Sequence, residues 1–278
     1  MASVLITGTS KGIGFEAALA FGRAGHTVHA TMRKPAQSPE LAETAAREKL
    51  PITVSAMDVD SDESVSSGIA AMLKNGPIDV LVNNAGIERV GSVEELPLAE
   101  FRAVMETNYF GAIRCIQALA PHMRQRGSGC IINVTSVAGR ISSAPMAPYA
   151  ASKWALEAAS EALAGEMKTF GVRVLIVEPG IIDTAMARRI GVPAKPSPYR
   201  QRERFADMFT NALKNPVHPS LVGKKILDLA ESNTWQLRHP VGPDAVPFLA
   251  WRAGMTDEAW VELNAADDET WQRGLKRE

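Results

Sequence analysis

Two side chains that could share proton chemistry, Tyr149 and Lys153, lie four residues apart in a helical pattern that spans residues 149–170. This spacing places both side chains on one face of a helix. A phenol ordinarily has a pKa of about 10, which is too high for efficient proton exchange at neutral pH. A neighbouring ammonium group favours the phenolate and lowers that pKa. The pair therefore predicts general acid–base catalysis by Tyr149 with the help of Lys153.

Ser136 is a candidate partner of this pair, because it lies just beyond the apolar segment 130–134, which is typical of a buried strand. Ligands of parallel α/β sheets bind beyond the carboxyl ends of the strands. The hydroxyl of Ser136 could therefore hydrogen-bond the same substrate oxygen as Tyr149. A serine hydrolase is not indicated, because Val134 occupies the first glycine position of the Gly-x-Ser-x-Gly turn.

A glycine-rich loop follows the first apolar segment, residues 4–6, and opens a helical pattern. Backbone N–H groups at such a helix start can bind a pyrophosphate, provided that glycines let the backbone come close. The spacing is Gly-x-x-x-Gly-x-Gly rather than the usual dinucleotide fingerprint, and no Gly-Lys-Ser/Thr of a P-loop follows. A simple turn is the alternative. The strand before it and the helix after it favour a dinucleotide site, with the loop reading Thr7-Gly8-Thr9-Ser10-Lys11-Gly12-Ile13-Gly14.

The second apolar segment, residues 27–31, is followed by Arg33 and Lys34, and no acidic residue appears before Glu40. An NAD enzyme of this type places Asp or Glu there to bind the ribose 2′-hydroxyl. Arg33 could instead make a paired, charge-assisted contact with a 2′-phosphate, with Lys11 approaching from the other side. The alternative is that these are solvated charges at a strand end. The pattern predicts NADP(H) as the cofactor.

Together these motifs resemble the short-chain dehydrogenase/reductase family over about residues 3–240. The resemblance rests on Thr7-Gly8-x-x-x-Gly12-x-Gly14, Asn83-Asn84-Ala85-Gly86, Asn108, Ser136, Tyr149-x-x-x-Lys153 and Pro179-Gly180. Within the family, residues 28–33 and 241–245 are similar to the hydroxysteroid and retinol dehydrogenase-like group.

The resemblance implies a hydride transfer between nicotinamide and a carbonyl or secondary alcohol, with Tyr149 passing the proton. It implies that Lys153 lowers the pKa of Tyr149 and hydrogen-bonds the ribose, that Ser136 polarises the carbonyl, and that Asn108 holds a water. Asp58 would contact the adenine, Asn83 would line the cleft and buttress the sheet, and Thr184 would contact the carboxamide. The full set of implied cofactor-binding residues is Gly8, Ser10, Lys11, Gly12, Ile13, Gly14, Arg33, Asp58, Val59, Asn83, Ala85, Gly86, Tyr149, Lys153, Pro179, Gly180, Ile182 and Thr184.

These residues must be positioned by a sheet whose strands are covered on both faces, since the β-branched segments are nearly continuously apolar. Each segment is followed by a longer helical pattern, which predicts right-handed βαβ units. We expect an α/β, doubly wound, Rossmann-like parallel sheet of about seven strands with helices on both faces, in a single domain over residues 1–278. The segments are residues 4–6, 27–31, 52–54, 79–82, 130–134 and 172–177, with a seventh near 235–238.

Two further segments are predicted around the site. Residues 181–219 contain five prolines and many basic residues, and form either a substrate lid or an irregular connection. The basic residues either meet an anionic substrate or form a solvated surface. Apolar residues there predict a lipophilic substrate wall, the alternative being that they only pin the segment to the core: Ile182, Met186, Ile190, Val192, Phe205, Met208 and Phe209, with Met146 nearby. The tail at 244–278 holds Trp251, Trp260 and Trp271, a density of tryptophan that predicts a packed tail; its place, over the active site or at an interface, is left open by the sequence.

Composition excludes several other classes. Thirty basic and thirty-one acidic residues give a net charge of -1, with no electrostatic signature of nucleic-acid or membrane binding. The longest segment without charged residues, 127–139, is too short for a membrane span. No histidine pairing predicts a metal site, and the acidic cluster at residues 58–63 is better explained as a helix cap at Asp60 or Ser61. Cys115 and Cys130 are expected to be buried.

The start Met1-Ala2-Ser3 leads directly into an apolar segment, so we expect no signal peptide and a cytoplasmic location. The resemblance implies that copies of the chain pair through the helices expected at about 98–125 and 149–170, as a homodimer or homotetramer. Two other functions are weighed. One is a redox sensor that binds the cofactor without chemistry, which the presence of Tyr149 and Lys153 disfavours. The other is an epimerase or dehydratase, which the short C-terminal part disfavours.

Overall fold

The computed structural model describes residues 1–192 and 196–275. The doubly wound parallel sheet is confirmed: seven strands follow the order β3-β2-β1-β4-β5-β6-β7, and every neighbouring pair is parallel. The order reverses between β1 and β4, and ligands bind at such a switch point. The strands are β1 (Ser3–Thr7), β2 (Thr27–Met32), β3 (Ile52–Ala56), β4 (Val80–Asn83), β5 (Gly129–Val134), β6 (Val172–Pro179) and β7 (Arg238–Val241).

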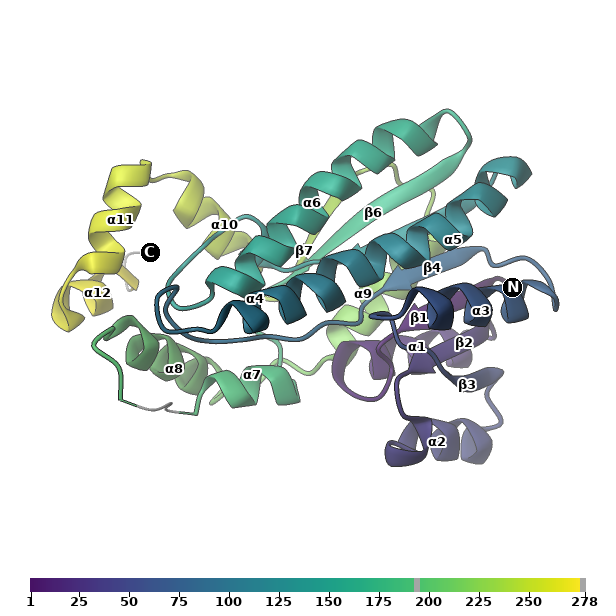
Figure 1. Ribbon diagram of the computed structural model, residues 1–278, viewed down its shortest axis with the longest axis horizontal. Helices are drawn as coiled ribbons and strands as arrows, with labels where there is room; N and C mark the ends of the chain where they lie inside the picture. The colour runs from purple at the N-terminus through teal and green to yellow at the C-terminus, as the bar shows by residue number, and fades with distance from the viewer. Residues whose placement is uncertain (193–195, 276–278) are drawn as a thin grey trace.

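Helices cover both faces of the sheet, as expected from strands that are apolar on both sides (Figure 1). Successive side chains of β1 divide between the two layers: Val4 and Ile6 pack with α1 and α9, whereas Leu5 packs with α3, α5 and the end of α6. The helices are α1 (Gly12–Arg23), α2 (Glu40–Glu48), α3 (Asp62–Leu73), α4 (Leu98–Met105), α5 (Gly111–Arg126), α6 (Ala147–Lys168) and α9 (Ser220–Glu231).

The acidic cluster after β3 caps a helix. The side chain of Ser61 accepts a hydrogen bond from the Ser64 amide at 3.2 Å, and Asp62 and Glu63 occupy the first turn of α3. Acidic residues there face the positive end of the helix dipole. Among the described residues, no group of three or more His, Cys, Asp or Glu side chains could hold a metal ion.

The two cysteines behave as small apolar residues. Cys115 and Cys130 are buried and free, and burial raises the pKa of the first thiol to about 12 and of the second to about 11. Neither is a thiolate at neutral pH. Within residues 1–192 and 196–275, no helix combines the length and hydropathy that a membrane span requires.

The proline-rich segment is more regular than the sequence suggested. It contains α7 (Ala185–Ile190) and α8 (Gln201–Ala212), whereas Pro193 and Lys195, two of its predicted features, lie outside the described residues. The tail forms three further helices, α10 (Ala245–Ala253), α11 (Asp257–Ala265) and α12 (Asp268–Leu275). Figure 1 shows the tail and α8 side by side at one end of the molecule.

Candidate active site

The glycine loop joins β1 to α1 in a conformation that needs its glycines. Gly8 and Gly12 have positive φ angles of 72° and 63°, a region that favours glycine. A Cβ at Gly8 would lie 2.7 Å from the Cα of Ala85, and one at Gly14 would lie 2.5 Å from the Gly8 carbonyl oxygen. Asn84 holds the loop by donating to the carbonyls of Thr7 (2.9 Å) and Gly8 (3.1 Å). The loop is a close-packed cradle at the start of a helix.

A cavity of about 440 Å³ runs along the carboxyl edge of the sheet, above the ends of β1 to β6. Size and position suit a ligand site. It brings together most of the predicted site residues: Gly8, Ser10, Lys11, Gly12, Ile13, Arg33, Asp58, Val59, Ala85, Gly86, Ser136, Tyr149, Lys153, Pro179, Gly180, Ile182 and Thr184.

Three predicted residues, Gly14, Asn83 and Asn108, do not line this cavity. Asn83 is buried in the sheet and donates to the Oδ1 of Asn133 on β5 at 2.8 Å, which fits the expected buttressing but differs from the expected place in the cleft. Strand side chains alternate between faces, so its neighbour Asn84 lines the cavity instead. Gly14 contributes indirectly, because its lack of a side chain leaves room for the Gly8 carbonyl.

Asn108 lies in a π-helical turn, Glu106–Phe110, between α4 and α5. Its Nδ2 donates to the Ile87 carbonyl and to the Ser152 hydroxyl, each at 2.9 Å, and its Oδ1 accepts from the Ile87 amide at 2.8 Å. π-Helical turns occur frequently at functional sites. Asn108 thus links the loop after β4 to Ser152 on α6, the residue that precedes Lys153. The water expected at Asn108 stays a prediction.

Tyr149, Lys153 and Ser136 meet in the cavity, supplied by α6 and the end of β5. The Nζ of Lys153 lies 5.6 Å from the Tyr149 ring centroid and donates to the Val134 carbonyl at 2.9 Å. Burial lowers the pKa of Lys153 to about 8, against the opposing charge of Glu157. Burial also raises the pKa of Tyr149 to about 12, while Ser136 opposes this rise.

The expected depression of the Tyr149 pKa by Lys153 is therefore not what this structure shows. Desolvation by burial is the largest cause of both shifts, and it disfavours the charged form of each group. Tyr149 is consequently a neutral phenol at pH 7, the form that can donate a proton.

Arg33 and Lys11, the residues expected to bind a 2′-phosphate, both line the cavity and are exposed. Arg33 directly follows β2, whose six residues include no acid. Burial raises the pKa of Asp60, and the positive charge of Arg33 partly offsets this rise. The end of β2 therefore presents positive charge to the cavity.

Residues 181–219, the predicted lid, supply an apolar wall of the cavity. All but one of the predicted lid residues line the cavity together with Met146: Ile182, Met186, Ile190, Phe205, Met208 and Phe209. Val192 was wrongly included, because α7 ends at Ile190 and the Val192 side chain is 64% exposed.

Basic residues of this segment form ion pairs, and those of Arg188, Arg189 and Arg200 lie at the surface, which fits the predicted solvated surface better than an anionic-substrate site. Arg188 pairs with Asp183 at 2.7 Å, and Arg189 pairs with Glu88 at 3.0 Å. The Arg189 pair reaches the loop after β4, and three more pairs join the segment to other parts of the chain: Arg202 to Glu95 before α4, and Arg200 and Arg204 to Asp268 in the tail. Ion pairs therefore link the predicted lid to the loop after β4, to the segment before α4 and to the tail.

The tail forms part of the wall of this cavity. Trp251, Trp260 and Trp271 all line the cavity. Trp260 packs edge-on against Trp251, with ring centroids 5.2 Å apart, and its Nε1 donates to the Ser142 carbonyl at 2.9 Å. Sequence reasoning predicted a packed tail from its tryptophans but did not assign them to the site.

Comparison with known proteins defines the class. The sequence model of the family described as short chain dehydrogenase matches residues 2–193. The chain therefore belongs to the short-chain dehydrogenase family, oxidoreductases that bind a nicotinamide cofactor.

Individual relatives match most of the chain. Retinol dehydrogenase 8 of Bos taurus is 35% identical over 266 residues, which cover 90% of this chain and 85% of that protein. A short-chain dehydrogenase structure from Streptomyces avermitilis superposes with a TM-score of 0.80 at 34% identity, covering 98% of this chain and 97% of that one. A variant of actinorhodin polyketide ketoreductase, solved with NADPH, gives a TM-score of 0.78 at 27% identity, covering 88% and 97%.

Proposed function

We propose that this protein is an NADP(H)-dependent oxidoreductase that acts on a lipophilic carbonyl compound or the matching secondary alcohol, with Tyr149 as general acid/base. The observation that carries the proposal is a single cavity. It joins the glycine cradle and Arg33 to Tyr149, Lys153 and Ser136, and then to the apolar lid and tail.

The residues of this chain suit a dinucleotide. The cradle leaves no room for a Cβ at Gly8 or Gly14 and begins a helix, where backbone N–H groups favour a phosphate. Gly12, Ile13 and Ser10 would hold the pyrophosphate, Asp58 and Val59 the adenine, and Pro179, Gly180, Ile182 and Thr184 the nicotinamide end. When bound, the cofactor supplies or accepts a hydride.

Side chains of the protein carry out the proton transfer. In the reduction direction the neutral phenol of Tyr149 donates its proton to the substrate oxygen, while the Ser136 hydroxyl hydrogen-bonds that oxygen. Lys153, protonated at neutral pH and fixed to the Val134 carbonyl, stabilises the phenolate that forms. Apolar side chains of residues 181–219 and the tail tryptophans line the cavity around these groups.

The preference for a lipophilic substrate follows from that wall. The substrate end of the cavity is lined by methionine, isoleucine, phenylalanine and tryptophan side chains. Each buried methylene of a substrate contributes up to about 0.8 kcal/mol there. The similarity to retinol dehydrogenase 8, whose name states an apolar alcohol, supports this class of substrate.

The preference for NADP(H) is supported by the positive charge at the end of β2 and in the glycine loop. A 2′-phosphate would receive charge-assisted hydrogen bonds from Arg33 and Lys11. The related ketoreductase structure contains NADPH.

The test is NADPH oxidation by the purified protein with a panel of aldehydes, ketones and quinones of graded apolar size. We expect turnover with at least one carbonyl class and rising kcat/KM with apolar size. Tight NADPH binding without turnover of any of them would refute the oxidoreductase assignment and favour a cofactor-binding sensor.

A further inference from the structure

Behind the catalytic pair, α6 carries a buried glutamate at the same spacing, Glu157. Tyr149, Lys153 and Glu157 follow one another at four-residue intervals and share one helix face. Glu157 is 4% exposed and does not line the cavity, so it does not touch a ligand there.

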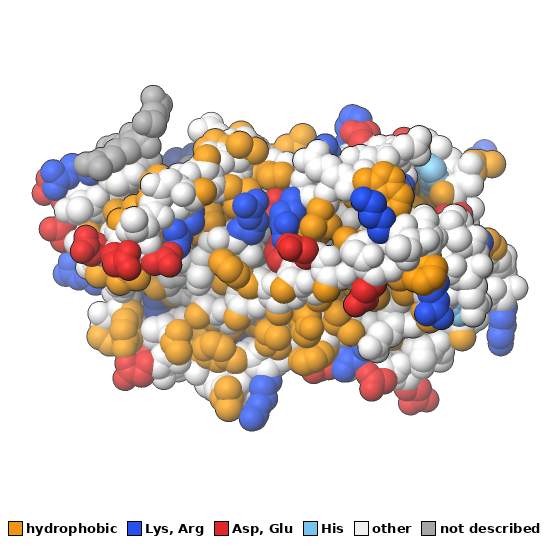
Figure 2. Space-filling model, turned by 90° about the horizontal axis from the view of Figure 1, so that it is seen from above, with side chains coloured by type: hydrophobic (Ala, Val, Ile, Leu, Met, Phe, Trp, Pro, Cys, Tyr) orange, Lys and Arg blue, Asp and Glu red, His pale blue; other side chains and the backbone are white. Residues whose placement is uncertain are grey.

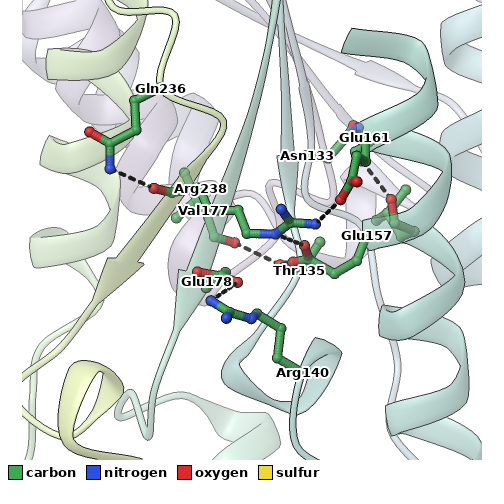
Figure 3. Close-up of polar contacts among 11 residues, drawn as sticks. Asn133, Thr135, Arg140, Glu157, Glu161, Val177, Glu178, Gln236 and Arg238 are labelled. Carbon is green, nitrogen blue, oxygen red and sulfur yellow. Dashed lines mark hydrogen bonds and ion pairs between the residues drawn. The ribbon is translucent and has the colours of Figure 1, made fainter. Parts of the chain in front are cut away.

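Both oxygens of the Glu157 carboxylate accept hydrogen bonds, one from Thr135 just after β5 and the other from Arg238 on β7 (Figure 3). Its Oε1 accepts a hydrogen bond from the Thr135 hydroxyl at 2.6 Å. Its Oε2 accepts from the Nε of Arg238 at 2.9 Å, at the start of β7. Glu157 therefore joins α6 to β7 and to the end of β5.

Thr135 lies between two residues that the proposed chemistry uses, Val134 and Ser136. On one side of it is Val134, whose carbonyl accepts from the Nζ of Lys153 at 2.9 Å. On the other side is Ser136. The Thr135 amide also donates to the Val177 carbonyl of β6 at 2.8 Å, so the Glu157 contact and this bond fix Thr135 from two directions.

The turn after Ser136 rests on the same side chain. A Cβ at Gly139 would lie 2.9 Å from the Cγ of Glu157, so the turn and the glutamate are in direct contact. A displacement of Glu157 would therefore move the turn that follows Ser136, and a shift of about 1 Å in a reacting group can lower a rate about a hundredfold.

We propose, on the basis of the proposed function, that Glu157 is a positioning residue for the reaction. Its carboxylate, through the Thr135 hydroxyl, holds Ser136 and the Val134 carbonyl in place against the face of α6 that carries Tyr149 and Lys153. Its negative charge also stabilises the ammonium form of Lys153.

Other charged groups surround this side chain and enter the pH dependence. Among the described residues, the side chain of the buried Glu178 of β6 has no hydrogen-bond partner, and it lies 3.7 Å from Arg140, which follows the turn. Within the part of the chain that the structure describes, the titratable and charged groups near Tyr149, Lys153 and Glu157 include Glu161 on α6, Glu178 on β6, Arg140 after the turn, Arg238 on β7 and Glu88 after β4.

Two variants separate the roles of Glu157. Thr135→Val removes the hydroxyl but keeps the shape of the side chain and the charge of Glu157. Glu157→Gln keeps an acceptor for Thr135 but removes the charge. The matched control is Glu161→Gln, because Glu161 also pairs with Arg238, at 2.6 Å, but is mostly exposed and does not contact Thr135.

We expect Thr135→Val and Glu157→Gln each to lower kcat about 10- to 100-fold. The NADPH dissociation constant should change less than about threefold in both. In Glu157→Gln alone, the alkaline limb of the pH profile should move to lower pH by roughly half a unit or more, because loss of the negative charge destabilises the ammonium. Glu161→Gln should change none of these.

Hydrogen exchange of the protein without cofactor tests the positioning separately from activity. The amides of residues 135–139 should exchange faster in Thr135→Val than in the wild type and in Glu161→Gln. Wild-type kcat together with wild-type exchange in Thr135→Val would overturn the proposal, even if Glu157→Gln failed to fold. If the wild type reduced no carbonyl, the proposed function would fail, and the exchange rates alone would decide whether Glu157 holds the end of β5.

Discussion

Replacement of Arg33 by aspartate reverses the charge at the point where β2 meets the cavity. A hydrogen bond to a charged group contributes about 1.5–3 kcal/mol. Because Arg33 is exposed, solvent and salt bring its contribution toward the lower part of that range. We therefore expect the wild type to bind NADPH at least about tenfold more tightly than NADH, or roughly 1.4 kcal/mol.

Arg33→Asp should abolish or reverse this preference, chiefly by weakening NADPH, because a carboxylate repels a 2′-phosphate but can accept a hydrogen bond from a 2′-hydroxyl. The assay is titration of both cofactors, followed by cofactor fluorescence, at low and high salt. The wild-type preference should shrink as salt rises.

Lys34→Asp is the matched control. It makes the same change in net charge one residue further along, but Lys34 does not line the cavity. Equal affinity of the wild type for NADPH and NADH would refute the reasoning. An equal effect of Lys34→Asp would show that overall charge, rather than a contact by Arg33, sets the preference.

Three further predictions concern the tail, the buried carboxylate behind the site, and assembly. Trp260→Ala should lower kcat/KM more for bulky apolar substrates than for small ones, by up to about 0.8 kcal/mol per methylene that loses its contact. The control is Trp235→Ala, because Trp235 is exposed and does not line the cavity. An equal loss of kcat/KM for all substrates would contradict a role of Trp260 in substrate selection. Burial and Glu157 raise the pKa of Glu178 from 4.5 to about 7, so its stabilising contribution is complete below pH 4.5 and is lost as pH rises through about 7. Urea unfolding should show this fall, on the order of 1–3 kcal/mol, and Glu178→Gln should remove it; an unchanged slope in the variant would exclude Glu178 as its source. The face shown in Figure 2 carries a band of hydrophobic side chains, and Trp154 on α6 is half exposed. Exposed apolar surface of this kind favours association of copies of the chain. Light scattering at micromolar concentration should therefore give a dimer or tetramer, and a monomer would contradict this.

The sheet could be predicted because buried parallel strands are apolar throughout, so each central strand has a clear signal. The seventh strand was expected at residues 235–238 but lies at Arg238–Val241. It is an edge strand that pairs only with β6 and contains Arg238, His239 and Pro240, and such strands lack a continuous apolar pattern.

The site could be predicted where its residues form local motifs. The glycine loop, Tyr149 with Lys153, and Arg33 after β2 each have a spacing with a direct physical meaning, and the structure places all of them in one cavity. What depends on tertiary contacts could not be found this way. The pairing of Thr135, Glu157 and Arg238 joins residues far apart in the chain. The rise in the Tyr149 pKa depends on burial, which only the folded chain defines.

The most direct test of the account is the turnover of Tyr149→Phe with NADPH and the best carbonyl substrate of the panel, measured beside the NADPH dissociation constant of the same protein. Phenylalanine keeps the ring and removes only the hydroxyl that the account assigns to proton transfer. We predict a loss of at least about a hundredfold in kcat, the scale of lost acid–base catalysis, with NADPH binding retained. Turnover near the wild-type rate would contradict the role of Tyr149 and with it the proposed mechanism.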